Sequence, residues 1–443
     1  MELNLDIDLS PYFETVKRSE FAKIEGRIEV VKGLAVEASG IGVGIGTLCE
    51  IFTEGKNTIM AEVVGFSQGR SVLMPYGDTR GIKPGSKVVK KDDQPLALVG
   101  EGLLGRVIDG LGNPIDGKGN IDADEYYQLY GKPINPLERK PIREPMDVGI
   151  AAINTMVPLG RGQRVAIMAG SGVGKSVLMG MMTRHTTADV VVIGLIGERG
   201  REVKEFIEEI LGEDGMKRAV VVAATSDSPP LVRMRGAYLA TAVAEYFRDQ
   251  GKDVLLFLDS LTRYAMSSRD VGLASGEPPT SRGYTPSFFV KIPVLLERAG
   301  TLKDSGSITG IYTVLVEGDD MNDPVGDTVR SIVDGHIVLS RDLANKGHYP
   351  AIDVLSSVSR VARDVTPTEY LNIRDQAVRF LSTYREAEDM ISIGAYRDGS
   401  DPEIDKAKNI APKINEFLKQ DMNKRMRIEQ SFPLLKKIVG FGK

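Results

Sequence analysis

A glycine-rich segment near the middle of the chain carries the clearest chemical signal. Residues 169–176 read Ala-Gly-Ser-Gly-Val-Gly-Lys-Ser, between an apolar run at 164–168 and a helix-like segment at 177–187. Glycines let backbone N–H groups approach phosphate oxygens without side-chain clashes, and a following helix adds partial positive charge. In this pattern Lys175 reaches the β- and γ-phosphates of ATP, and the Ser176 hydroxyl ligates Mg²⁺. The predicted nucleotide-binding residues of this phosphate loop are Gly170, Ser171, Gly172, Val173, Gly174, Lys175, Ser176 and Val177.

Two acidic residues follow predicted strands at the edge where a parallel sheet collects its ligands. Glu198 and Asp259 come directly after the apolar runs at 190–197 and 254–258. Ligands bind at the carboxyl ends of parallel strands, so we expect both carboxylates to meet the phosphate loop. Asp259 is then expected to hold Mg²⁺, and Glu198 to polarise the water that attacks the nucleotide.

Each of these acids also has a simpler interpretation that the spacing leaves open. Glu198 and Arg199 would fit a solvated charged turn, and Asp259 would fit the N-cap of the next helix. Arg263 lies one helical turn after Asp259 and is expected to face the same site.

The elements that position these residues form an alternating pattern from about residue 93 to residue 360. Short apolar runs suited to central strands alternate with amphipathic stretches, which is typical of a parallel sheet covered by helices. We therefore predict an α/β nucleotide-binding domain at 93–360. The predicted strands are 164–168, 190–197, 219–224, 254–258, 311–316 and 337–339.

The flanking regions differ in pattern from this domain. Residues 23–92 hold short Val- and Ile-rich runs separated by glycines, which favours a small β-barrel. Residues 361–443 lack strand runs and predict a helical domain, in which Ile414, Phe417, Leu418, Met422 and Met426 recur at helical spacing. Residues 1–22 form an appendage with a short helix at 12–20, because Ser10-Pro11 is a typical helix start. The predicted barrel strands are 28–31, 48–52, 59–64, 71–74 and 87–89.

Composition excludes several classes of protein. The 443 residues carry a formal net charge of −5, which argues against a protein that coats nucleic acid. No apolar run approaches a membrane span, and the acidic start does not resemble a secretory signal. The single cysteine, Cys49, precludes an internal disulfide and fits a reducing, cytoplasmic location. The three histidines are scattered, which disfavours a His/Cys metal site.

Five stretches of the chain together resemble one family: AGSGVGKS, IGERGREVKEF, LLFLDSLTRYA, GEPPTSRGYTPS and YPAIDVLSSVSR. Over about residues 23–380 the chain resembles the hexameric rotary ATPases, which include ATP synthase catalytic subunits and type III secretion ATPases. MPYGDTRGIKPG and FVKIPVLLERAG are most similar to the flagellar protein-export ATPases, with the injectisome ATPases as the nearest alternative. The resemblance implies an N-terminal β-barrel, a RecA-like P-loop domain and a C-terminal helical domain.

The same resemblance implies roles for individual residues. Glu198 matches the catalytic glutamate, and Asp259 matches the Walker B aspartate. Arg360 matches the arginine finger that reaches into the neighbouring subunit's site, and Tyr349 matches the aromatic that stacks on adenine. The predicted catalytic set is Lys175, Glu198, Arg199, Arg263 and Arg360, and the predicted Mg²⁺ ligands are Ser176 and Asp259.

The chain departs from the family pattern at two positions. Ala169 replaces the usual first glycine of the phosphate loop, and Asn154 stands where relatives commonly have Asp. Asn154 precedes the loop by some fifteen residues, so we expect no effect on the chemistry.

The family also implies partners and a location. Six copies form a ring whose sites lie at subunit boundaries, so a homohexamer would hold six competent sites and the isolated monomer would be a poor ATPase. The appendage would dock a regulator, and the helical domain would meet a stalk protein, chaperones or export substrates. The protein would associate peripherally with the export gate at the cytoplasmic face of the inner membrane.

Three other functions are consistent with parts of the pattern. A non-catalytic nucleotide-binding ring subunit would keep the phosphate loop, but such subunits lose the carboxylate that Glu198 provides here. An ATP synthase catalytic subunit matches less well over GEPPTSRGYTPS. A ring-shaped RNA translocase is disfavoured by the acidic balance and by the scarcity of aromatic stacking residues in the N-terminal region.

Overall fold

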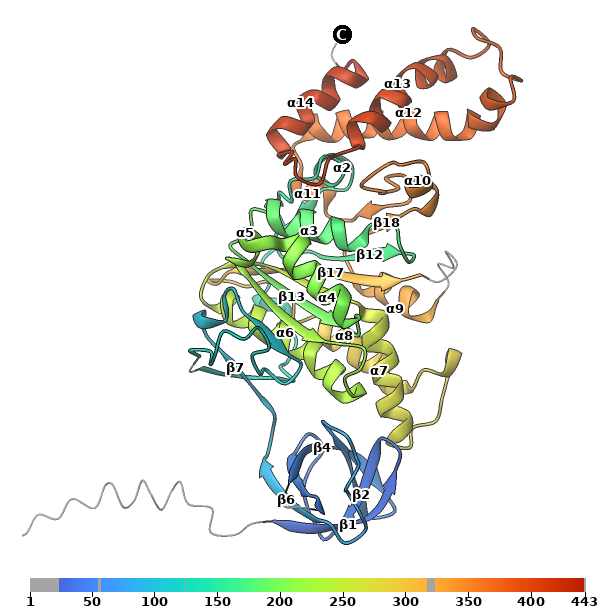
Figure 1. Ribbon diagram of the computed structural model, residues 1–443. Helices are drawn as coiled ribbons and strands as arrows, with labels where there is room; N and C mark the ends of the chain where they lie inside the picture. Colours follow the sequence, from blue (N-terminus) through green and yellow to red (C-terminus); the bar gives the residue numbers. More distant parts are fainter. Residues whose placement is uncertain (1–23, 55–56, 124, 317–322, 442–443) are drawn as a thin grey trace, which may run out of the picture. The chain divides into compact units, whose positions relative to one another are not determined.

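The computed structural model describes residues 24–54, 57–123, 125–316 and 323–441. It separates into two compact units, Met1–Pro95 and Leu96–Lys443 (Figure 1). The predicted appendage at 1–22, with its helix at 12–20, lies outside the described residues. Within the described ranges, no helix combines the length and apolar character that crossing a bilayer requires.

The first unit is a closed barrel with the strand order β1-β2-β5-β4-β3-β6. Its interior is apolar and includes the buried thiol of Cys49, whose pKa burial raises to about 11. The sequence predicted every strand of the barrel except β2. Buried Glu37 interrupts the apolar pattern of that strand and pairs with Lys32 and Arg70. The strands are β1 (Glu25–Lys32), β2 (Ala35–Ser39), β3 (Leu48–Phe52), β4 (Thr58–Ser67), β5 (Arg70–Pro75) and β6 (Lys87–Asp92).

The second unit is built on a nine-stranded sheet in the order β19-β18-β12-β17-β15-β13-β14-β8, with β16 paired to β17. The strands from β18 to β8 run parallel, whereas β19 and β16 are antiparallel edge additions. The strands are β8 (Val107–Asp109), β12 (Arg164–Ala169), β13 (Val190–Ile196), β14 (Ala219–Ala224), β15 (Asp253–Asp259), β16 (Gly300–Thr301), β17 (Ser307–Leu315), β18 (Gly335–Leu339) and β19 (Val358–Ser359).

Helices cover both faces of this sheet, which explains why its central strands are apolar throughout. Alternate residues such as Ile167 and Ile193 join a core cluster with Leu178 of α3. The other face meets α6, where a Cβ on Gly194 would lie 3.1 Å from the Ala240 side chain. The covering helices are α3 (Lys175–His185), α4 (Gly200–Glu205), α5 (Gly212–Met216), α6 (Pro230–Asp249), α7 (Leu261–Ala274), α8 (Pro286–Leu296), α9 (Pro324–Ile332) and α10 (Arg341–Asn345).

Short elements complete the nucleotide domain. Two-stranded sheets pair β7 (Leu96–Val99) with β9 (Glu125–Gln128) and β10 (Pro145–Met146) with β11 (Leu159–Gly160). A π-helical turn at Phe206–Leu211 joins α4 to α5. The remaining short helices of this region are η2 (Glu101–Leu103), η3 (Pro136–Glu138), α2 (Ala151–Met156) and η5 (Ser281–Gly283).

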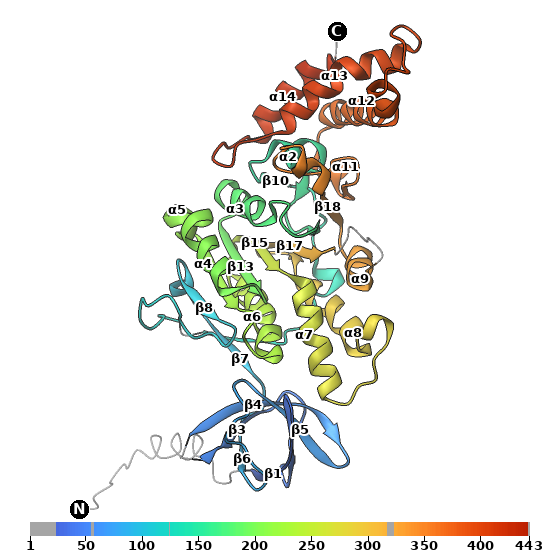
Figure 2. The same cartoon turned by 45° about the vertical axis from the view of Figure 1, so that its right-hand side comes forward.

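The C-terminal region is helical, and its helices lie together beside α2 (Figure 2). Tyr370 of α12 stacks on Phe432 of α14 with ring centroids 4.1 Å apart. The helical spacing through Met422 and Met426 was misleading, because both residues lie between helices rather than in one. Helix α13 ends at Leu418, and the backbone N–H of Gln420 turns away to donate to the Tyr349 carbonyl. The helices are α11 (Ala362–Val365), α12 (Thr368–Ser392), α13 (Pro402–Leu418) and α14 (Ile428–Val439).

Candidate active site

The phosphate loop connects the end of β12 to the start of α3. Gly172 and Gly174 have φ angles of +77° and +90°, a left-handed conformation that favours glycine. Helix α3 begins at Lys175, two residues earlier than predicted, so its first N–H groups lie within the loop itself. The loop lines a cavity of about 580 Å³. Val173 differs from its neighbours because its side chain is buried in the core, which leaves only its backbone for a ligand.

Three charged side chains meet beside the loop, as the strand-edge argument predicted. The Lys175 ammonium forms an ion pair with the Asp259 carboxylate and lies 3.6 Å from the Glu198 carboxylate. Burial opposes the charge on Lys175, but the two carboxylates outweigh it and raise its pKa. The lysine is therefore a cation already positioned at the end of the phosphate loop.

Asp259, at the end of β15, accepts hydrogen bonds from Lys175 and Thr313 on the same carboxylate oxygen. The hydroxyl of Thr313, on neighbouring β17, donates to Asp259 Oδ1 at 2.6 Å. The alternative that Asp259 caps the next helix is wrong, because the side chain of Ser260 caps α7 by accepting from Arg263 N–H. The Asp259 carboxylate is consequently free of a structural capping role and faces Lys175.

Glu198 lies within the cavity lining rather than in a fully solvated turn. Its side chain is 16% exposed, whereas that of Arg199 is 79% exposed and pairs with Glu202 at 3.3 Å. Burial raises the pKa of the Glu198 carboxyl to about 7; Lys175 opposes this shift, and Asp259 and Glu202 add to it. A carboxyl that titrates near neutrality is suited to general base chemistry.

The donor set fits a magnesium ion next to a nucleotide. Ser176 contributes a hydroxyl to the cavity lining, and Asp259 contributes a carboxylate next to Lys175. Oxygen donors of this kind are the ligands that Mg²⁺ prefers.

Arg263 also lines the cavity, from the first turn of α7. A Cβ on Gly197 would come within 2.8 Å of the Arg263 Cβ, so the glycine lets the strand end approach this helix closely. The structure therefore brings Lys175, Glu198, Arg199 and Arg263 to one cavity.

Tyr349 borders the phosphate loop from a different part of the chain. A Cβ on Gly174 would lie 3.5 Å from the Tyr349 ring. Tyr349 is 48% exposed and lines a second cavity of about 310 Å³, to which Gly174 and Val177 also contribute. This position beside the phosphate loop is compatible with the adenine contact that the resemblance implied.

Arg360 is the one predicted catalytic residue that does not join this cavity. It follows β19, which pairs with the amino-terminal end of β18, whereas the phosphate loop lies at the carboxyl end of β12. The Arg360 backbone N–H donates to the Asp334 carbonyl at 2.9 Å, and its guanidinium donates to the Arg330 carbonyl at 3.3 Å. Any role in hydrolysis would therefore be at another subunit's site.

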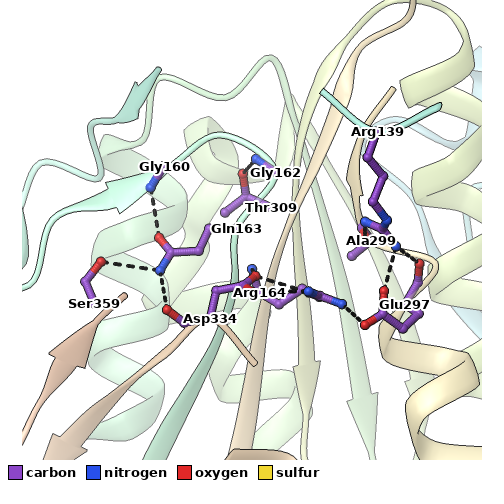
Figure 3. Close-up of polar contacts among 10 residues, drawn as sticks. All are labelled: Arg139, Gly160, Gly162, Gln163, Arg164, Glu297, Ala299, Thr309, Asp334 and Ser359. Atoms are coloured by element: carbon purple, nitrogen blue, oxygen red, sulfur yellow. Dashed lines mark hydrogen bonds and ion pairs between the residues drawn. The ribbon is translucent and has the colours of Figure 1, made fainter. Parts of the chain in front are cut away.

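A buried polar network holds β19, the strand that directly precedes Arg360. Figure 3 shows Gln163 between the Gly160 backbone, the Asp334 carbonyl and the Ser359 hydroxyl. Gln163 is fully buried, and Asp334 also accepts from Arg164 at 3.0 Å. The exposed arginine thus directly follows an edge strand that buried hydrogen bonds attach to the sheet.

Sequence reasoning missed three polar residues that line the cavity, Glu202, Ser226 and Arg341. Ser226 follows β14 and Arg341 follows β18, so both lie at carboxyl ends of predicted strands. The signal that could have identified these two residues is the same as for Glu198 and Asp259, a polar side chain just after a central strand.

Comparison with known proteins agrees with this geometry. The nucleotide-binding domain model of the ATP synthase alpha/beta family matches residues 149–359, and its beta-barrel model matches residues 28–91. A C-terminal domain model of the type III secretion ATPase EscN matches residues 366–437. A flagellum-specific ATP synthase of Pseudomonas aeruginosa is 49% identical, with 98% of this chain and 97% of the relative covered. The chain belongs to the ATP synthase alpha/beta family.

Solved structures support membership at the level of the fold. The assembled ATPase EscN from the type III secretion system of enteropathogenic E. coli superposes with a TM-score of 0.89, at 44% identity over 94% of this chain and all of EscN. EscN in complex with its central stalk EscO gives a TM-score of 0.86 at 43% identity, over the same shares of each chain. These matches confirm the predicted barrel, nucleotide domain and helical domain, and the enzyme class of a P-loop ATPase.

Proposed function

We propose that this chain hydrolyses ATP to ADP and phosphate, with Mg²⁺, to drive the export of flagellar proteins through a type III secretion apparatus. The observation that carries the proposal is the convergence of Lys175, Glu198 and Asp259 at the phosphate loop. The flagellum-specific relative supports the flagellar assignment. A non-catalytic ring subunit is disfavoured because Glu198 lies where a catalytic carboxylate is needed.

Each residue has a defined role in this proposal. Backbone N–H groups of 170–176 bind the phosphates, and Lys175 neutralises the charge on the γ-phosphate. Ionised Glu198 accepts a proton from the attacking water. Ser176 and Asp259 would hold Mg²⁺, which when bound would supply positive charge to the phosphate oxygens. Arg199 and Arg263 add positive charge at the same cavity, and Tyr349 stacks on the adenine.

The assembly we propose is a homohexamer in which Arg360 completes the neighbouring subunit's site. Arg360 is exposed and lies away from its own phosphate loop, as an arginine that acts on another subunit must. EscN has been solved assembled and with its central stalk, which supports a ring and a stalk partner for this chain. We further propose peripheral association with a membrane export gate from the cytoplasm, with a regulator, chaperones and export substrates as partners.

The test of this proposal is ATP hydrolysis by the purified chain across a range of protein concentrations. We expect phosphate release per subunit to rise with concentration, because each site needs a neighbour, and to stop when a chelator removes Mg²⁺. A specific activity that is flat with concentration and unaffected by chelation would contradict both the ring and the metal.

The pH dependence of ATP hydrolysis offers a second test, which concerns the role of Glu198. The carboxyl accepts a proton only when ionised, and burial raises its pKa to about 7, so kcat/KM should rise with pH up to about 7 and then level off. The pH dependence of kcat/KM reports the pKa values of groups in the free enzyme. The pKa of Glu198 in the site without nucleotide is therefore the one that this measurement tests. Glu202→Gln removes a neighbour that raises the Glu198 pKa and should move the rising limb to lower pH. If Glu202→Gln does not shift the rising part of the pH profile, the group that titrates there is not Glu198.

The alternative is the ATPase of an injectisome, which the similarity to EscN favours. Both kinds of ATPase hydrolyse ATP, so only the identity of the exported proteins distinguishes the two functions. Restoration of flagellar filaments in a strain lacking its flagellar export ATPase would support the first function, and restoration of effector secretion alone would support the second.

A further inference from the structure

Strand β19, which directly precedes Arg360, is too short to fix its own position. It consists of Val358 and Ser359, which pair with His336 and Gly335 at the edge of the sheet. Strands of globular proteins usually have roughly 3–10 residues, so a ladder of two pairs gives weak support. The contacts that determine where the Arg360 side chain starts must therefore come from outside the strand.

Asp334 is the residue to which the backbone of Arg360 is attached. Its carbonyl accepts from the Arg360 backbone N–H at 2.9 Å, and its own N–H donates to the Arg164 carbonyl at 2.8 Å. The Asp334 carboxylate accepts from the Arg164 backbone N–H at 3.0 Å and from the guanidinium at 3.2 Å. The guanidinium of Arg164 also pairs with Glu297, as Figure 3 shows. The attachment point of Arg360 is thus bonded to the first residue of β12 through both backbone and side chain.

Gln163 adds a second set of hydrogen bonds at the same place. Its amide nitrogen donates at 3.1 Å to the Asp334 carbonyl, the oxygen that also accepts from Arg360, and at 3.4 Å to the Ser359 hydroxyl. Its amide oxygen accepts from the Gly160 backbone N–H at 2.9 Å. A fully buried amide is costly without partners, so these bonds hold the side chain in one orientation. Gln163 therefore contacts both the residue before Arg360 and the carbonyl to which Arg360 is bonded.

The Arg360 side chain depends on this support of its backbone. It is exposed, and its guanidinium donates to the Arg330 carbonyl across a long distance of 3.3 Å. The charged group lies at the end of a long flexible side chain, so a small rotation of the backbone displaces it by a larger distance. A group that takes part in catalysis must be held within roughly 0.5 Å of its productive position.

We propose that Gln163 and Asp334 are positioning residues, which fix the backbone at Arg360 so that its guanidinium reaches the nucleotide of the neighbouring subunit. This inference rests on the proposed function, because it assumes that Arg360 completes the neighbour's site. The phosphate loop follows the other end of β12. A buried change at Gln163 should therefore impair hydrolysis in the neighbouring subunit and spare nucleotide binding in its own.

The experiment compares Gln163→Met with Gln376→Met in the full-length protein. Both substitutions replace an amide by an apolar side chain of similar length. Gln376 donates to the Val439 carbonyl at 3.4 Å between α12 and α14, so Gln376→Met is the control and should match wild type. We expect Gln163→Met to lower kcat by roughly 10- to 100-fold, the effect of misplacing a group that acts on the substrate. Its Kd for ADP should stay within about twofold of wild type.

Mixed rings show in which subunit the defect acts. In an equal random mixture with Glu198→Gln, roughly a quarter of the boundaries pair the intact Glu198 of a Gln163→Met subunit with a supported Arg360 of its neighbour. Hydrolysis per subunit should therefore rise above that of Gln163→Met alone, although the added subunits lack the proton acceptor. In a mixture with Arg360→Ala, no boundary has a supported arginine, so hydrolysis per subunit should fall.

Three results would overturn the proposal. The first is wild-type kcat in Gln163→Met. The second is recovery with Arg360→Ala rather than with Glu198→Gln, which would place the defect in the subunit's own site. The third is recovery with neither partner while Arg360→Ala and Glu198→Gln restore each other, which would indicate a general loss of structure. If Arg360→Ala and Glu198→Gln do not restore each other, the proposed ring mechanism is wrong, and this inference is wrong with it.

If Gln163→Met does not fold, Ser359→Ala carries the same test. It removes the hydroxyl that accepts from Gln163 and that donates to the Pro158 carbonyl at 2.6 Å. Its control is Ser356→Ala, the same chemical change at an exposed serine three residues earlier. Ser359→Ala should regain hydrolysis in mixtures with Glu198→Gln, and recovery with Arg360→Ala instead would again contradict the proposal.

Discussion

Glu198→Gln is expected to reduce ATP hydrolysis by about 100- to 10,000-fold, the range typical of removing a general base, while nucleotide binding stays close to wild type. The carboxylate lies 3.6 Å from Lys175 within the cavity lining, so its loss removes the proton acceptor without disturbing the phosphate loop. Phosphate release under saturating ATP measures the first effect, and calorimetric titration with ADP measures the second.

The matched control for this change is Glu205→Gln. Glu205 is an exposed carboxylate at the end of α4, outside the cavity lining, and the chemical change is the same. We expect this variant to hydrolyse ATP at the wild-type rate. Substantial activity in Glu198→Gln would mean that another group accepts the proton, and the catalytic assignment of Glu198 would be wrong.

Arg360→Ala is expected to reduce hydrolysis by about 1,000-fold or more, as removing an arginine finger does in related phosphoryl-transfer enzymes. The nucleotide cavity of the variant subunit should remain intact, because Arg360 lies at the opposite end of the sheet strands from the phosphate loop. ADP binding is therefore expected to stay unchanged.

Mixing Arg360→Ala with Glu198→Gln subunits provides the decisive readout. A boundary between an Arg360→Ala subunit and a Glu198→Gln neighbour has one intact glutamate facing one intact arginine. In equal random mixtures of a six-membered ring, roughly a quarter of the boundaries would have this arrangement, so activity should recover well above either variant alone. Arg363→Ala, which changes an exposed arginine of α11 three residues later, is the control and should keep full activity. An inactive mixture of subunits that assemble normally would argue that each site is complete within one chain.

Part of the active site was predictable because local sequence carries its signal. The phosphate loop needs left-handed backbone at Gly172 and Gly174, and only glycine adopts that conformation without strain. Glu198 and Asp259 follow apolar runs whose length identifies buried strands, and parallel strands bring their carboxyl ends to one edge. The meeting of Lys175, Glu198 and Asp259 follows from the position of the phosphate loop and from this shared edge.

Other parts were predicted only through family resemblance or not at all. Tyr349 and Arg360 have no local pattern that distinguishes them from ordinary surface residues, so the resemblance alone singled them out. The apolar spacing through Met422 suggested helix, whereas tertiary hydrogen bonds bend the chain there. Strand β2 escaped detection because its buried Glu37 is neutralised by Lys32 and Arg70, and neither partner is evident from the strand itself.

The sequence by itself determined the phosphate loop, the central strands β12, β13, β14, β15, β17 and β18, and the acids that follow two of them, because backbone conformation and hydrophobic period are local properties. Only the tertiary structure decided which distant segments complete the site. Gln163 meets Ser359 across a separation of 196 residues, and Asp259 meets Thr313 across 54. Such contacts depend on how packed elements come together in space, and a single long-range hydrogen bond leaves no periodic pattern in the sequence of either segment.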